Sequence, residues 1–212
     1  MIADFKETIS DNNFIRTLIH SLFIMGDSIR PIVQKPIISQ FIGKNFYQHT
    51  LDAGCGNGLY TRLLIKRAQK VDALDYSESS INKLKRRLGH LPHLSLHVGS
   101  ADNLPFANEQ FDLALHCEVL EHIENDRQVL SELFRVLQPG GYLIISVPVP
   151  PAPYIDSEHV REGYTLEQIS QLLQEAGFTI IYHQYCMFKF SKNLMRFLVW
   201  WGEKTKLRLP SF

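Results

Sequence analysis

Apolar residues along this chain gather in short runs that alternate with stretches of helical periodicity, from about residue 48 onward. The predicted strands are 49–53, 71–74, 94–98, 111–116, 142–147 and 178–182, and the predicted helices are 59–69, 78–88, 126–137 and 165–176, the last ending before Gly177. Strand–helix alternation at this spacing is typical of parallel βαβ units, whose right-handed crossovers place helices on both faces of the sheet. The pattern therefore predicts an α/β fold with a doubly wound, mostly parallel sheet.

Two flanking segments fall outside this alternation. Residues 1–47 have apolar residues at helical spacing, which predicts an N-terminal helical cap that packs on the domain, covers the substrate as a lid, or does both. Residues 48–190 form the predicted main domain, in which 185–190 would add a seventh strand. Residues 191–212 combine an apolar helical face containing tryptophan with basic residues, so we predict an amphipathic helical tail that packs on the domain or makes a weak peripheral membrane contact.

Composition narrows the range of partners. The 22 Lys and Arg residues balance 22 Asp and Glu residues, whereas a nucleic-acid binder usually has a basic excess, so no nucleic-acid partner is predicted. The three cysteines, Cys55, Cys117 and Cys186, are odd in number and form no CxxC pair, which disfavours a disulfide framework or a zinc site. The first residues also lack the pattern of a signal peptide. We therefore predict no metal site and a cytoplasmic location.

The segment with the most specific chemistry follows the first predicted strand. Gly54, Gly56 and Gly58 alternate between a strand and a helix, where glycine allows a tight turn and close approach of a ligand to the backbone. Dinucleotide-binding loops have the spacing GxGxxG, whereas this loop reads GxGxG. Asp52, two residues before the first glycine, would repel a pyrophosphate and attract a ligand that bears an ammonium and a sulfonium. The loop therefore favours a cationic nucleoside over a nicotinamide dinucleotide.

A second acidic residue, Asp75, ends the second predicted strand. A carboxylate at this place can accept hydrogen bonds from both hydroxyls of a ribose. It can also cap the helix that follows, although Ser77 is equally suited to that role. Both roles are compatible with the position.

Taken in order, these motifs resemble the class I S-adenosylmethionine-dependent methyltransferases, in particular the methyltransferase type 11 group, over about residues 48–183. Residues 52–58 resemble the first motif of the family, 99–106 the loop after strand three, 111–123 the fourth motif and 137–141 the turn before strand five. The resemblance implies S-adenosyl-L-methionine as cofactor and a small-molecule acceptor, lipid-like or anionic. The implied cofactor-binding residues are Asp52, Gly54, Cys55, Gly56, Gly58, Asp75, Tyr76, Ala101, Asp102, Asn103 and Cys117.

The predicted acceptor site lies where the fourth and fifth strands end. The candidate catalytic residues are His116, His159, Arg161 and Tyr164, with Glu118, Glu121 and His122 as further candidate bases. Histidine is a plausible base near neutral pH, and arginine would suit an anionic acceptor. Because parallel strands end at one crevice, we expect these side chains to lie together beside the cofactor, under a lid from residues 10–45.

Three other functions compete with this prediction. A nicotinamide-dependent oxidoreductase is disfavoured by the loop spacing and by Asp52. A nucleic-acid methyltransferase is disfavoured by the zero net charge and by residues 116–119, His-Cys-Glu-Val, where base-amino methyltransferases have a Pro-Pro-aromatic motif. A non-catalytic S-adenosylmethionine-binding protein would retain the same loops, so the sequence leaves that alternative open. No oligomeric state is predicted.

Overall fold

A computed structural model describes residues 29–150 and 159–186 of the chain. Contacts within the chain divide it into two units, residues 38–184 and a second unit of residues 1–37 with 185–212, and the fold below is that of the first unit. The predicted tail, residues 10–28 of the predicted lid and residues 187–190 of the predicted seventh strand lie outside the described residues.

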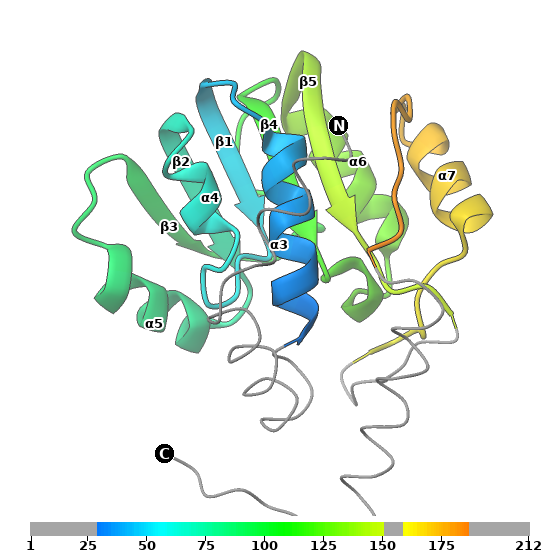
Figure 1. Ribbon diagram of the computed structural model, residues 1–212, viewed down its shortest axis with the longest axis horizontal. Coiled ribbons are helices and arrows are strands. Elements are labelled where there is room, and N and C mark those ends of the chain that lie inside the picture. Colours follow the sequence, from blue (N-terminus) through cyan, green and yellow to red (C-terminus); the bar gives the residue numbers. More distant parts are fainter. Residues whose placement is uncertain (1–28, 151–158, 187–212) are drawn as a thin grey trace, which may run out of the picture. The chain divides into compact units, whose positions relative to one another are not determined.

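Five strands form one parallel sheet in the order β3-β2-β1-β4-β5 (Figure 1). The strands are β1 (Tyr47–Ala53), β2 (Ala68–Asp75), β3 (Leu94–Val98), β4 (Phe111–Cys117) and β5 (Leu137–Ser146). Neighbouring strands continue outward from β1 through β2 in one direction and from β1 through β4 in the other. The carboxyl ends of β1 and β4 therefore flank the switch point of the sheet, where ligands of doubly wound proteins bind.

Helices cover both faces of the sheet, as the alternating pattern predicts (Figure 1). They are the end of α3 (Ile29–Ile42), of which residues 38–42 belong to this unit, α4 (Thr61–Leu64), α5 (Glu78–Leu88), the 3-10 turn η1 (Leu120–His122), α6 (Asp126–Val136) and α7 (Leu166–Glu175). The end of α3, α4 and α5 pack their apolar side chains with Val71 and Leu113 in one core. Helices α6 and α7 pack theirs with Leu51 and Ala114 in a second core on the opposite face. None of the helices in the described ranges is long and apolar enough to cross a membrane.

Local signals located several elements closely. Helix α5 covers the predicted residues 78–88, and the Ser77 hydroxyl accepts the N–H of Ser80, so Ser77 is the cap. Gly177 follows the end of α7 with φ +102°. The N–H of Gly177 donates to Gln174 O, and that of Phe178 donates to Leu173 O, which together satisfy the last carbonyls of the helix.

The predicted helix 59–69 is wrong in its extent, because only Thr61–Leu64 are helical. Strand β2 begins at Ala68, where it pairs with Tyr47 of β1. Residues 68 and 69, which the apolar periodicity assigned to a helix, therefore belong to a strand of the sheet instead.

The predicted sixth strand is also not formed, since residues 178–182 have no strand assignment. Phe178 and Ile180 pack against the core of α6 and α7, whereas Ile181 and Tyr182 are exposed. The alternation of apolar residues is therefore that of an extended segment with one buried side. Such a segment becomes a strand only when a neighbouring strand supplies ladder hydrogen bonds, and none of the described strands pairs with it.

Candidate functional site

The glycine loop after β1 is closed on one side and open on the other. Gly54 has φ +86°, and a Cβ at this position would overlap the side chain of Val119, which follows β4. Gly56 has φ +50°, and no atom lies within 4 Å of the position its Cβ would occupy. The N–H groups of Gly54 and Cys55 both donate to Leu74 O, at 2.7 and 2.9 Å, which anchors the loop to β2. The loop is thus held firmly while its backbone near Gly56 faces free space.

Asp75 at the end of β2 fastens this loop. Its Oδ2 accepts the Gly56 N–H at 2.7 Å, and its Oδ1 accepts the Ser77 N–H at 2.9 Å. Since Ser77 caps α5, the capping role predicted as an alternative for Asp75 belongs to Ser77. Each carboxylate oxygen keeps a further lone pair, which can accept a hydroxyl of a ligand. Tyr76 beside it is 72% exposed and offers an aromatic face at the same edge.

Asp52 lies behind the loop rather than on its surface. Its side chain is only 1% exposed, and its Oδ2 accepts the Thr61 hydroxyl at 2.6 Å. Burial raises the pKa of Asp52 to about 6, although the Thr61 hydrogen bond lowers it in part. Asp52 can therefore act on a bound cation through its charge from behind the loop.

The loop after β3 carries the residues predicted to meet the adenine. Ala101 is buried, Asp102 is half-buried and Asn103 is exposed, so the last two present polar groups at this edge. Two residues of α6 hold the loop that follows. Glu132 Oε2 accepts the Leu104 N–H at 2.8 Å. Arg135 donates to Leu104 O at 3.1 Å and to Phe106 O at 2.8 Å.

Sequence reasoning missed this pair on α6. Glu132 and Arg135 are joined by an ion pair at 2.7 Å, and Arg135 holds the pKa of the Glu132 carboxyl below its usual range. The detectable sign was Glu132 itself, a carboxylate three residues after Val129 on the apolar side of an amphipathic helix. Buried charges need partners, so such a position indicates a structural ion pair.

His116, predicted as a base, is wholly buried in β4. Its Nδ1 donates to Ala53 O at 2.9 Å, and burial lowers the pKa of the ring to about 4, so the ring is neutral near pH 7. Its Nε2 has no hydrogen-bond partner in the part of the chain that the structure describes. A side chain without solvent access does not fit the predicted contact with an acceptor. Cys55 and Cys117 are buried as well, so Cys55 can serve a ligand only through its backbone.

Arg161 and Tyr164 form a clamp on the turn that follows β4. The Arg161 guanidinium donates to three backbone carbonyls, those of Leu120, Ile123 and Glu124, at 3.1, 2.7 and 2.8 Å. It also donates to the Tyr164 hydroxyl at 2.6 Å, and that hydroxyl donates to Asp126 Oδ2 at 3.0 Å. Tyr164 is 4% exposed. The prediction that these two side chains contact an acceptor does not fit this arrangement, because their polar groups bind the protein itself.

His159 lies against the turn after β4. Its ring lies edge-to-face against His122, with ring centroids 4.4 Å apart. The next residue, Val160, donates its N–H to Glu121 O at 3.1 Å. Glu121 is completely buried, and His122 Nε2 lies 4.0 Å from Glu121 Oε1. The structure thus brings together three of the predicted candidates, Glu121, His122 and His159.

Glu118, the first residue after β4, has a feature that the sequence does not reveal. Its φ of +58° places a non-glycine residue in the left-handed region. Its N–H donates to Ser146 O and its carboxylate accepts the Ser146 hydroxyl, both at 2.9 Å. Backbone strain of this kind gathers at functional sites, and here it lies at the carboxyl end of β4.

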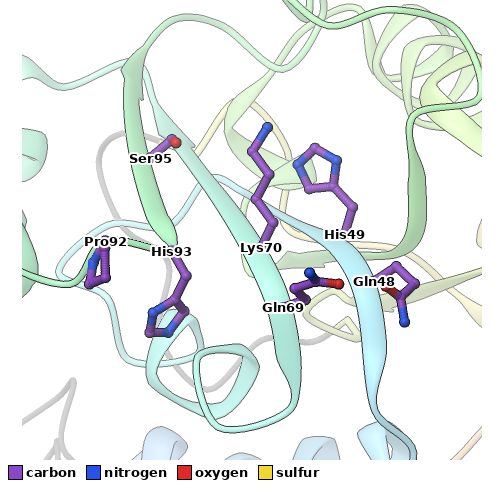
Figure 2. A pocket seen from close by; sticks show the side chains of 7 residues that line it. All are labelled: Gln48, His49, Gln69, Lys70, Pro92, His93 and Ser95. Atoms are coloured by element: carbon purple, nitrogen blue, oxygen red, sulfur yellow. The ribbon is translucent and has the colours of Figure 1, made fainter.

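A separate open hollow of about 510 Å³ lies at the opposite end of the strands. Figure 2 shows its lining side chains, which come from the starts of β1, β2 and β3 and from the turn before β3: Gln48, His49, Gln69, Lys70, Pro92, His93 and Ser95. His49 and His97 each contact one oxygen of the buried Asp72 carboxylate, which Lys70 Nζ approaches at 3.8 Å. This hollow contains none of the predicted cofactor residues, since those follow the carboxyl ends of the strands.

Comparison with known proteins matches the same region. A family model described as a methyltransferase domain matches residues 51–145. A probable S-adenosylmethionine-dependent methyltransferase of Mycolicibacterium smegmatis is 33% identical over 136 residues, covering 61% of this chain and 51% of that protein. Phthiotriol/phenolphthiotriol dimycocerosates methyltransferase 1 of Mycobacterium ulcerans is 33% identical over 126 residues, covering 58% and 46%. The chain thus spans about half the length of these relatives.

Solved structures agree on the fold. The structure of a SAM-dependent methyltransferase from Leishmania major superposes with a TM-score of 0.64 at 18% identity, covering 74% of this chain and 66% of that one. Three observations agree: the strand order, the open glycine loop that Asp75 holds at Gly56, and the family match over residues 51–145. Residues 51–145 are a methyltransferase domain, and the likenesses in sequence and fold support a class I S-adenosylmethionine-dependent methyltransferase.

Proposed function

We propose that this protein transfers a methyl group from S-adenosyl-L-methionine to a small-molecule acceptor. The main support for the proposal is the Asp75 carboxylate, which accepts a hydrogen bond from Gly56 in the glycine loop. Asp75 is the last residue of β2 and lies beside the switch point of the sheet. S-adenosylmethionine supplies a methyl group on a sulfonium, whose positive charge already activates it for displacement. The chain then needs mainly to bind, align and shield the reactants.

The residues around the loop fit the groups of this cofactor. Asp75 would accept from the ribose hydroxyls, and Asp102 and Asn103 would bind the polar edge of the adenine. The space beside Gly56 leaves room for a ligand against the backbone. Asp52 would stabilise the cationic part through its charge. The negative charges of two carboxylates, Asp52 behind the loop and Asp75 beside it, would repel a pyrophosphate, which disfavours the nicotinamide alternative.

For the acceptor, we propose a lipid-like small molecule that binds next to the ends of β4 and β5. The Mycobacterium ulcerans relative is named for such acceptors, phthiotriol and phenolphthiotriol dimycocerosates. The anionic alternative loses its support, because Arg161 is engaged by backbone carbonyls and Asp126. Of the predicted acceptor-site residues, we retain His159, together with His122, next to the proposed acceptor.

Titration calorimetry tests the cofactor. We expect S-adenosylmethionine and S-adenosylhomocysteine to bind with a stoichiometry of about one, and NAD to give no heat of binding under the same conditions, since the GxGxG loop with Asp52 does not suit a pyrophosphate. Binding of NAD in preference to S-adenosylmethionine would contradict the proposal. Transfer of label from methyl-labelled cofactor to a fraction of cell extract then separates an enzyme from a protein that only binds the cofactor.

The raised pKa of Asp52 predicts a pH dependence of cofactor binding. Above about pH 6 this carboxyl is ionised and attracts the cationic cofactor, and below that pH it is protonated and neutral. Lowering the pH from 7 to 5 should therefore weaken S-adenosylmethionine binding by about 1 kcal/mol, roughly 5-fold. Asp52→Asn, which keeps an acceptor for the Thr61 hydroxyl, should bind weakly at both pH values. If the Asn variant shows the same pH dependence as the natural protein, another group is responsible.

A further inference from the structure

The cluster of Glu121, His122 and His159 has the composition of a metal site. One ligand atom from each residue lies within 4.8 Å of the ligand atoms of the other two. An ion bound at about 2.0–2.2 Å to each of two atoms holds them roughly 3–4 Å apart. His122 Nε2 and Glu121 Oε1, at 4.0 Å, are already at that separation. The other ligand atoms must move closer by about 1 Å to reach this separation, which small rotations of the two half-buried histidine rings can supply.

The cluster is held in place by the clamp described above. His159 is followed by Val160, whose N–H donates to Glu121 O. Next comes Arg161, whose guanidinium donates to the carbonyls of Leu120, the first residue of η1, and Ile123, which follows η1. Glu121 and His122 are themselves part of η1. These hydrogen bonds join two segments that are distant in the sequence, and the three side chains lie on them. An ion would therefore meet a largely preformed site.

The donor set indicates which ions would bind. Two imidazoles and one carboxylate suit transition ions such as Zn²⁺, Mn²⁺ and Fe²⁺, whereas Mg²⁺ and Ca²⁺ prefer oxygen ligands alone. Glu121 is completely buried, and a divalent cation beside it would offset the cost of burying its charge. Half-buried His122 and His159 give an ion a route from solvent. Three protein ligands leave further coordination positions for water or for an oxygen of another molecule.

We propose that Glu121, His122 and His159 bind one divalent transition-metal ion at the carboxyl ends of β4 and β5. This differs from the sequence prediction of no metal site, which rested on the three cysteines that form no CxxC pair. Binding of the ion depends on the geometry of these three residues alone. Any part it has in positioning an oxygen of the acceptor rests on the proposed function.

The test uses the full chain, freed of metal by chelation, and titrates it with Zn²⁺ by calorimetry and with Co²⁺ by visible absorption. We expect one ion per chain and the ligand-field bands of Co²⁺ bound by nitrogen and oxygen. His122→Ala and His159→Ala should each weaken binding by at least about 100-fold, which exceeds the usual effect of an outer-shell partner. Glu121→Gln should do the same if it folds, and the two histidine variants keep the test decisive if it does not.

His93→Ala is the matched control, because His93 lines the separate hollow at the other end of the strands. It should bind the ion as the natural protein does. Absence of binding to the natural protein, or unchanged binding in His159→Ala, would overturn the metal site. Calorimetry with S-adenosylhomocysteine on the same samples keeps the proposals apart. Cofactor binding without metal binding refutes only the metal site, and the reverse refutes only the proposed function.

Discussion

Asp75→Ala should weaken the binding of S-adenosylhomocysteine by about 1–3 kcal/mol, roughly 5- to 150-fold in the dissociation constant. Two losses add in this variant. The carboxylate no longer accepts the ribose hydroxyls, and the Gly56 N–H loses the oxygen that holds the glycine loop at 2.7 Å. Titration calorimetry at pH 7.5 measures the effect directly. Asp75→Asn keeps one acceptor oxygen and should lie between the natural protein and the alanine variant.

Glu78→Ala is a suitable control for this experiment, because Glu78 is an exposed carboxylate in the first turn of α5, three residues after Asp75. Its removal should leave the affinity within about 2-fold, as expected for a solvated charge. An unchanged affinity in Asp75→Ala would show that this carboxylate serves only the protein backbone. The proposed position of the ribose would then be wrong.

Arg161→Ala should lower the free energy of unfolding by about 2–4 kcal/mol, the scale for losing several hydrogen bonds made by one charged group. The variant leaves the carbonyls of Leu120, Ile123 and Glu124 and the Asp126 carboxylate without their guanidinium. Arg161→Lys keeps the charge but not the planar fork, so it should recover only part of the loss. Urea denaturation followed by circular dichroism measures all three proteins.

The matched control is Arg86→Ala, which removes an exposed arginine from α5 and should change stability by less than about 0.5 kcal/mol. A different outcome would restore the sequence-based role of Arg161. If Arg161→Ala is as stable as the natural protein but loses turnover with unchanged cofactor affinity, the guanidinium acts on the acceptor. The clamp would then contribute little to holding η1.

Features that depend on neighbouring residues could be predicted from the sequence. The spacing of apolar residues located α5 and β3, and Gly177 marked the end of α7, because helix periodicity and caps are decided within a few residues. The glycine loop and Asp75 could be assigned for the same reason, since a strand end, a tight turn and a helix start are consecutive in the chain. These local features were sufficient for the fold class and the family.

Tertiary contacts decided what the remaining candidates do. His116, Arg161 and Tyr164 are the residue types expected in an active site, yet burial and distant partners give them structural roles. The proximity of His159 to Glu121 and His122 likewise depends on how the segments after β4 and β5 fold together at one edge of the sheet. A residue's type and spacing determine the local backbone and the chemistry available to it. Which groups meet, and whether water or another protein group occupies their polar atoms, is decided only when distant segments pack together.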